Sequence, residues 1–233
     1  VTDENIEIHD PLNDRRGMAL TRSGENGTEI YLQLDPGESC ILTCLPAKAE
    51  MQAPDIQAWK YSEPDESQKI QPGGQWTLTP IEGAPQIPEP ARMEELVSWT
   101  GLGEDWETFS GAVVYSQDFQ MPEKLLKKDF LLDLGDVRET GRVRINGQEV
   151  GLSWSVPFKL LIPAGILRES NTMEIEVRNL SFNRVIDLDR KGTTWKNYYE
   201  INFVNIQYKP YDASGAEPMP SGLLGPVTMT PLN

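Results

Sequence analysis

The pattern that most constrains the fold is a hairpin near the middle of the chain, in the run GRVRINGQEVG (141–151). Val143 and Ile145 alternate with arginines, so one face of this strand is apolar and the other is charged. Asn146 and Gly147 follow, and both residue types tolerate the positive φ that a type I′ turn requires. The sequence therefore predicts two antiparallel strands here, with one face buried.

Short strand patterns recur along the chain, separated by residues that favour turns. They cover 29–34, 39–45, 56–61, 76–79, 109–119, 130–134, 158–162, 171–180 and 226–230. The turn sequence DPGE (35–38) joins the first two into an expected hairpin over 28–46. The nearly all-apolar run 130–134 is expected at the centre of a sheet. Helix patterns are weak, so the chain is predicted to be all-β, a β-sandwich or jelly roll.

Two stretches are predicted to lack regular structure. Residues 80–90 are rich in proline and are expected to form a loop. Residues 181–225 are expected to form a long connection between the last two strands. Connections of that length inside a compact domain are usually functional or packed against a neighbour.

Composition and charge disfavour several classes of function. The formal net charge is −15, which disfavours nucleic-acid binding, and no apolar run approaches the length of a membrane span. The only histidine is His9, so a multi-histidine zinc site and a Ser-His-Asp triad are both poorly supported. Cys40 and Cys44 would lie about 13 Å apart on one strand, too far for a mutual disulfide. Both are expected to be small buried side chains.

Several segments together resemble a known family of sugar-processing enzymes. The runs FSGAVVYSQDF, FLLDLGDVRETGRVRINGQEVG and PFKLLIPAGILRESNTMEIEVRNL resemble the galactose-binding-like jelly roll of glycoside hydrolase family 2. More closely, the chain resembles the C-terminal region of the family 106 glycoside hydrolases, the α-L-rhamnosidases. The runs IYLQLDPGESCIL, GGQWTL, LVSWTGL and PSGLLGPVTM favour this second resemblance.

The resemblance implies a division of the chain and a role for it. Residues 1–70 would be a β-strand segment that closes or extends an upstream β domain, and residues 71–233 would be a galactose-binding-like jelly-roll domain. In the family the catalytic carboxylates lie on an N-terminal (β/α)₈ barrel. No such pattern exists in this chain, so no catalytic residue is predicted here.

The expected function is therefore a non-catalytic accessory region of a glycoside hydrolase acting on plant or microbial polysaccharide. The expected partners are carbohydrate and the catalytic domain of the parent enzyme, with no nucleic acid and no membrane span. The chain is expected to be monomeric, and the bacterial parent enzyme to be periplasmic, cell-surface or secreted. The alternative is a free-standing carbohydrate-binding module that holds a sugar through loop aromatics.

Aromatic residues in predicted loops are the candidates for sugar contact, since aromatic faces pack against the apolar side of sugar rings. The candidate ligand-binding residues are Trp154, Arg184, Trp195, Tyr198 and Tyr199. The alternative is that these rings pack beneath the long loops or against the missing barrel.

Acidic residues in the predicted loops suggest two further kinds of site. Glu104, Asp105, Asp187 and Asp189 are candidates for a glycosidase carboxylate pair, but their spacing singles out no two of them. A structural Ca²⁺ is the one cofactor considered, because folds of this kind often carry such an ion. Asp187 and Asp189 offer it oxygen ligands. The alternative is an acidic turn paired with Arg184 or Arg190.

Overall fold

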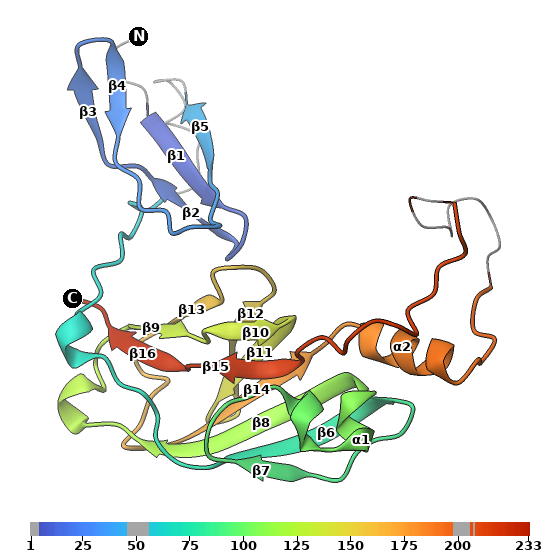
Figure 1. The fold of residues 1–233 in the computed structure, drawn as a ribbon. Helices are drawn as coiled ribbons and strands as arrows, with labels where there is room; N and C mark the ends of the chain where they lie inside the picture. The colour runs from blue at the N-terminus through green and yellow to red at the C-terminus, as the bar shows by residue number, and fades with distance from the viewer. Residues whose placement is uncertain (1–4, 46–55, 198–205, 207) are drawn as a thin grey trace.

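The computed structural model describes residues 5–45, 56–197, 206 and 208–233 (Figure 1). The regular structure of the described chain is mainly β-strand, arranged in antiparallel sheets, which confirms the predicted β class. Two units are distinguished by their pairing: the first unit is residues 5–62 and the second unit is residues 63–233. Pro64 bridges to Leu232 and Ile70 to Met229 of the last strand, so we group these residues with the second unit.

The first unit consists of one three-stranded sheet and one hairpin. Its strands are β1 (Asn5–Asp10), β2 (Arg15–Met18), β3 (Thr21–Gly24), β4 (Gly27–Ile30) and β5 (Ile41–Leu45). The sheet has the order β2-β1-β5, and β3 pairs with β4. Among its described residues, the buried apolar side chains are Ile6 and Ile8 of β1.

The predicted hairpin over 28–46 is wrong. The DPGE turn forms, with the Glu38 amide donating to the Asp35 carbonyl at 3.0 Å. However, β4 pairs with the preceding β3, and β5 pairs with β1. The two-residue connection between β3 and β4 gives β4 a nearer partner, while Ile6 and Ile8 supply the apolar strand that β5 joins.

The second unit is a stack of two β layers (Figure 1). One layer is a six-stranded sheet in the order β12-β11-β14-β8-β6-β7. Its strands are β6 (Trp76–Ala84), β7 (Ala91–Met93), β8 (Ser110–Gln120), β11 (Thr140–Ile145), β12 (Gln148–Ser153) and β14 (Ser170–Arg178). The other layer holds the sheet β13-β9-β16 and the pair β10-β15. Its strands are β9 (Phe130–Asp133), β10 (Asp136–Arg138), β13 (Lys159–Ile162), β15 (Gly222–Gly225) and β16 (Thr228–Pro231).

The alternation in the sequence defines the core between these layers. Val143 and Ile145 of β11, and Met173, Ile175 and Val177 of β14, are all 0% exposed. β9 lies between β13 and β16, which confirms the central position predicted for its apolar run.

The β11–β12 hairpin forms as predicted. Asn146 and Gly147 have φ values of 54° and 76°. The Asn146 side-chain amide also donates to the Ile166 carbonyl at 3.0 Å and to Asn171 at 2.9 Å. This turn therefore sets the register of the hairpin and also ties it to the segment before β14.

Two predictions about loops need correction. β6 continues through Pro80 to Ala84, with a register shift in its pairing with β8 after Pro80, so half of the predicted loop 80–90 is strand. The predicted connection 181–225 contains the helix α2 (Phe182–Arg190) and the strand β15. Among the described residues, the other helical turns are α1 (Glu104–Glu107), η2 (Glu66–Gln68), η3 (Trp99–Leu102) and η4 (Glu123–Leu125).

The expectation that both cysteines are buried is wrong. Cys40 is half-buried and Cys44 is exposed. The reason is that Cys44 belongs to β5, four of whose five residues are exposed. The described residues include no helix of the length and apolar character that crossing a membrane requires.

Candidate functional site

Trp154, the first predicted sugar contact, lies in the turn between β12 and β13 and is 56% exposed. The same turn approaches the first unit, since a Cβ added to Gly37 would lie 3.0 Å from the Val156 side chain. Trp154 is therefore an exposed ring near the junction of the two units. Helix α2, which carries or precedes the other candidates, lies at a different edge of the second unit (Figure 1).

The other described candidates are engaged with each other around α2. Arg184 pairs with Asp187, which also pairs with Lys191 at 2.8 Å. The indole N–H of Trp195 donates to Asp189 at 2.7 Å, and Lys196 lies 5.3 Å from the Trp195 ring centroid. Tyr198 and Tyr199 lie outside the described residues.

Asp189 fastens the segment after α2 back onto the helix. Its carboxylate, 8% exposed, accepts from the Ala213 amide at 2.8 Å as well as from Trp195. Although burial favours the neutral form, the hydrogen bonds from Ala213, Trp195 and Lys196 hold the pKa of Asp189 below its usual 3.8. Four of the predicted site residues, Arg184, Asp187, Asp189 and Trp195, are therefore engaged with one another or with lysines around α2. We call these four residues and Lys196 the α2 clasp.

The α2 clasp does not fit a calcium site. Asp187 and Asp189 have separate sets of partners, and each is already paired with a cationic side chain. Within the described part of the chain, no group of three or more His, Cys, Asp or Glu residues is placed to hold a metal ion. Calcium prefers six to eight oxygen ligands, and the two carboxylates offer it no common cage.

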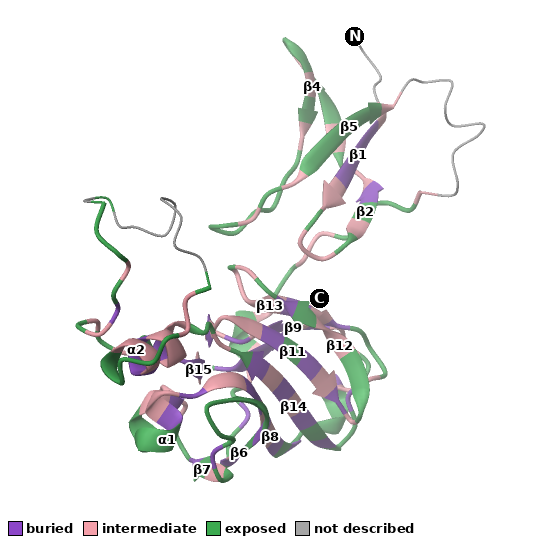
Figure 2. Ribbon diagram, turned by 90° about the vertical axis from the view of Figure 1, so that its right-hand side faces the viewer, coloured by how far each residue is buried: buried purple, intermediate pink, exposed green. Residues whose placement is uncertain are grey.

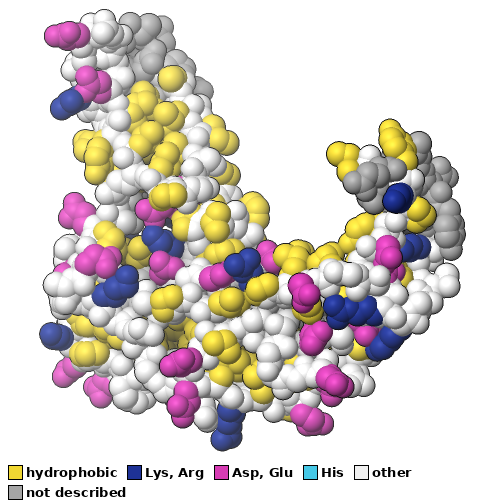
Figure 3. All heavy atoms as spheres, viewed as in Figure 1, with side chains coloured by type: hydrophobic (Ala, Val, Ile, Leu, Met, Phe, Trp, Pro, Cys, Tyr) yellow, Lys and Arg dark blue, Asp and Glu magenta, His cyan; other side chains and the backbone are white. Residues whose placement is uncertain are grey.

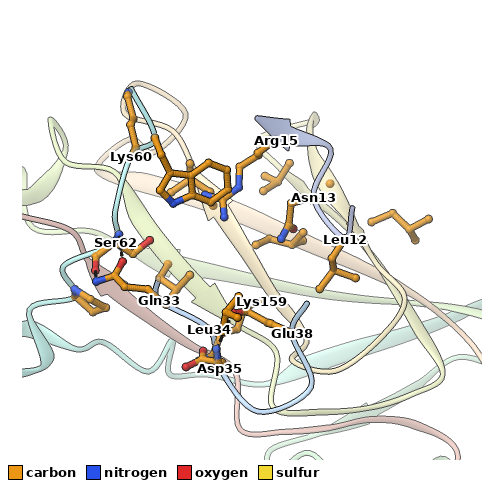
Figure 4. Close-up of a pocket in the computed structure, with 18 of the residues that line it drawn as sticks. Leu12, Asn13, Arg15, Gln33, Leu34, Asp35, Glu38, Lys60, Ser62 and Lys159 are labelled. Carbon is orange, nitrogen blue, oxygen red and sulfur yellow. Dashed lines mark hydrogen bonds and ion pairs between the residues drawn. The ribbon is translucent and has the colours of Figure 1, made fainter. Parts of the chain in front are cut away.

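A cleft of about 660 Å³ lies between the first and second units (Figure 4). The first unit lines it with Leu12, Asn13, Arg15, Gln33, Leu34, Asp35, Glu38, Trp59, Lys60 and Ser62. The second unit lines it with apolar surface from β9, β12 and β13 and with Lys159. Ligand pockets typically enclose roughly 300–1,000 Å³ and occur preferentially at such junctions. We refer to this feature as the inter-unit cleft.

Trp59 is positioned in the cleft by β2. The Met18 amide donates to the Gln57 carbonyl at 2.9 Å, and the Trp59 amide donates to the Met18 carbonyl at 2.8 Å. This approach needs a glycine in β2, because a Cβ on Gly17 would lie 2.8 Å from the Trp59 Cα. The Arg15 guanidinium lies 4.8 Å from the centroid of the Trp59 ring.

An ion pair fixes that arginine over the ring. Arg15 donates to Asp10 at 3.0 Å, and Asn13 donates to the same carboxylate at 2.9 Å. Although burial favours the neutral acid, the hydrogen bonds from Asn13 and Arg15 lower the pKa of Asp10. The charge that orients Arg15 is therefore present at neutral pH.

The two units are joined across the cleft. Lys159 of β13 pairs with Asp35 of the first unit (Figure 4). Burial opposes the charged ammonium, but the hydrogen bond and the charge of Asp35 raise the pKa of Lys159. Within the first unit, the Gln33 side chain exchanges two hydrogen bonds with the Ser62 backbone, at 2.9 and 3.0 Å.

The first unit also exposes a group of large apolar side chains (Figure 3). We use the name apolar face for these exposed residues together; its members are Leu20 (60% exposed), Tyr31 (50%), Leu32 (38%), Ile41 (57%) and Leu42 (39%), of which Ile41 and Leu42 point to opposite sides of β5. β5 is an edge strand, since in the described residues it pairs with β1 alone. Exposed apolar patches and open strand edges are typical of surfaces that pack against another protein segment.

Sequence reasoning missed both the inter-unit cleft and the apolar face. The sequence predicts Trp59 in a strand. It does not predict the neighbouring strand, because Trp59 bonds to Met18, about 40 residues away in the sequence. The sequence of β5 predicts a strand, but not whether anything covers it.

Comparisons with known proteins connect the chain to parts of larger ones. No protein-family model matches it. Over 161 residues, 60% of this chain, it is 34% identical to a putative β-glucuronidase of Formosa agariphila, of which it covers 14%. It resembles the solved rhamnosidase from Novosphingobium sp. PP1Y with a TM-score of 0.71 and 24% identity, over 99% of this chain and 21% of that one. A β-glucuronidase from Ruminococcus gnavus gives a TM-score of only 0.49 at 16% identity, over 75% of this chain and 32% of that one.

The Formosa match relates 60% of the chain to part of a larger protein that is named as a glycosidase, and the Novosphingobium match shows that the chain has the fold of part of another. It spans about a fifth or less of the Novosphingobium and Formosa proteins. With the rhamnosidase, the common fold extends over both units.

Proposed function

We propose that the chain is a non-catalytic accessory region of a glycoside hydrolase acting on plant or microbial polysaccharide, with α-L-rhamnosidase as the activity of the parent enzyme. One observation carries the proposal: 99% of the chain has the fold of 21% of a rhamnosidase. The sequence adds that the chain has no (β/α)₈ pattern. The second unit is then a galactose-binding-like jelly roll, a description that its two antiparallel layers fit.

The role we propose is to buttress the catalytic domain and to supplement substrate binding. The apolar face and the β5 edge support the first part, because removing exposed apolar surface from water is favourable when a neighbouring domain covers it. The occupant is an upstream domain of the same polypeptide. With the apolar face covered from within the same polypeptide, the protein is monomeric. The parent enzyme works in the periplasm, at the cell surface or outside the cell.

A free-standing carbohydrate-binding module is the second candidate. The observation that favours it is Trp154, a ring that is 56% exposed. Calorimetry of the 233-residue chain with rhamnose- and galactose-containing oligosaccharides addresses this candidate. A heat signal that saturates at millimolar or lower sugar and disappears in Trp154→Ala would favour it over the accessory role.

The decisive test of the accessory role begins with the gene. We expect the reading frame upstream of Val1 to continue for several hundred codons and to encode alternating strands and helices of a (β/α)₈ barrel. We expect the longer polypeptide, and not the 233-residue chain, to hydrolyse 4-nitrophenyl α-L-rhamnoside. Turnover by the 233-residue chain that is lost on substitution of a single carboxylate would overturn the proposal.

A further inference from the structure

We propose that the inter-unit cleft is a binding site for a neutral oligosaccharide, with the Trp59 ring as its apolar contact. The proposal rests on the proposed function for the choice of carbohydrate as the ligand class. The location, the contacting groups and the preference for a neutral sugar come from the geometry of the cleft. The site differs from the predicted one, because neither Trp154 nor the α2 clasp lines it.

The cleft has the two kinds of surface that a sugar ring needs. One wall is apolar, formed by residues of β9, β12 and β13 such as Leu152 and Leu160, and Leu152 is 44% exposed. The facing wall carries Trp59 among polar side chains. A sugar presents C–H groups on its faces and hydroxyl groups around its rim, so an aromatic ring flanked by hydrogen-bonding groups is complementary to it.

Unused hydrogen-bonding groups surround the ring. Four residues that line the cleft carry a polar group without a hydrogen-bond partner among the described residues (Figure 4 labels three of them). These groups are the indole N–H of Trp59, the ammonium of Lys60, the hydroxyl of Ser62 and the side-chain carbonyl of Asn13. Three of these groups are donors and two can accept, which matches the mixed donor and acceptor character of sugar hydroxyls.

The side chains that fix the geometry of the cleft are different from those that are available to bind a ligand. Arg15 is fixed over Trp59 by Asp10, Gln33 is bound to the Ser62 backbone, and Lys159 joins the two walls through Asp35. A ring that is already oriented costs less entropy to use in binding than one on a free loop. The exposed ring of Trp154 lacks this support.

The charge balance of the cleft favours a neutral ligand. Its lining contains the cations Arg15, Lys60 and Lys159 and the anions Asp35, Glu38 and Glu66. Arg15 and Lys159 are neutralised by carboxylates, and the whole chain carries a formal charge of −15. A uronate would therefore meet no net positive field at the site.

The test is a ¹H–¹⁵N NMR titration of the 233-residue chain that follows the indole N–H signal of Trp59. The probes are methyl α-L-rhamnopyranoside and lactose as neutral sugars and sodium D-glucuronate as a charged one. We expect a saturable shift with a neutral probe at about millimolar concentration, as weak single-ring contacts allow. The Leu152→Arg variant, which places a long side chain in the cleft, should weaken binding by about tenfold or more.

Two matched variants separate blocking from unfolding. Leu180→Arg is the control, because Leu180 is 52% exposed and does not line the cleft, so binding should stay within about twofold of the original chain. Lys60→Ala removes an exposed, unpaired donor without touching the core, and it should weaken binding by several-fold even if Leu152→Arg fails to fold.

Several outcomes would overturn the inference. These are no saturable shift with either neutral probe, equal binding by Leu152→Arg and Leu180→Arg in folded protein, or a preference for glucuronate. Loss of binding in Trp154→Ala, with the Lys60→Ala variant unaffected, would move the site to the β12–β13 turn. None of these results affects the gene-level and turnover tests of the accessory role, so the two proposals fail separately.

Discussion

The two units bury their apolar residues to very different extents (Figure 2). In β14 of the second unit, Met173, Ile175 and Val177 are 0% exposed, whereas in β5 of the first unit Ile41 and Leu42 are 57% and 39% exposed. Both strands contain alternating or continuous apolar residues, but in the described part of the chain only β14 has a second layer of β-structure above it. The second unit therefore buries its apolar strands, whereas the first unit leaves large apolar side chains exposed.

The largest expected effect tests this difference directly. Ile175→Ala should destabilise the chain by about 2–5 kcal/mol, because it removes buried methyl groups and leaves a cavity. The same deletion at Ile41 should change the stability of the isolated chain by roughly 0.5 kcal/mol or less. Urea unfolding followed by tryptophan fluorescence measures both. Similar losses in the two variants would mean that β5 is covered in solution.

A pair of glycines provides the next comparison. Gly222 has φ of 106°, and a Cβ there would lie 2.3 Å from the Tyr115 hydroxyl oxygen and 2.8 Å from the Trp99 ring. Gly27 of the first unit has φ of 140° with nothing within 4 Å of its Cβ position. Both alanine variants carry backbone strain, but Gly222→Ala should cost roughly 1–3 kcal/mol more because of overpacking. Thermal unfolding of the two variants checks the difference, and equal melting temperatures would count against the packed contact.

Acid should release the α2 clasp before the core of the second unit unfolds. The pKa of Asp189 is lowered in the folded chain, so its contribution to stability is present above its unfolded value of about 3.8 and is lost as the pH falls below that value. The indole N–H signal of Trp195, followed by NMR from pH 6 downward, should shift at acidic pH. In Asp189→Asn the shift should be absent; an unchanged titration in this variant would assign the effect to another acid.

The smallest expected effect concerns the ion pair between the units. Lys159→Ala should cost about 0.2–1 kcal/mol, since both partners are partly exposed and water screens the pair. The pKa of Lys159 is raised, so the contribution is complete below about pH 10.5 and is lost as the pH rises through the folded value. X-ray scattering at low and high salt measures the spacing of the units. If the spacing of the two units were the same in Lys159→Ala as in the original chain, their arrangement would be attributed to the close approach of Gly37 and Val156.

The sequence was sufficient where local pattern and long-range structure agree. The β11–β12 hairpin follows from its Asn146–Gly147 turn, and the buried face of β14 follows from its alternation. It failed where pairing depends on distant segments: β5 joins β1, 30 or more residues away, in place of the nearer 29–34 run. Helix α2 was missed because it is only nine residues long and two of its three buried residues, Asn183 and Asp187, are polar.

The contacts of the candidate site residues could not be predicted from the sequence, for the same physical reason. Trp195 and Arg184 were singled out as aromatic and polar loop residues, but their partners on α2 are set by the helix that was not predicted. The inter-unit cleft depends on how the two units meet, and Trp59 reaches it through its contact with β2. Neither relation is encoded in spacing along the chain.

The most direct test of the account is hydrogen exchange at β5, measured by mass spectrometry in the 233-residue chain and in a polypeptide extended upstream of Val1. If an upstream domain covers the apolar face and the β5 edge, amides of Ile41–Leu45 should exchange rapidly in the shorter chain and by an order of magnitude or more slower in the longer one. Peptides from β14 should exchange at the same slow rate in both. Equal rapid exchange of β5 in the two polypeptides would contradict the proposed interface.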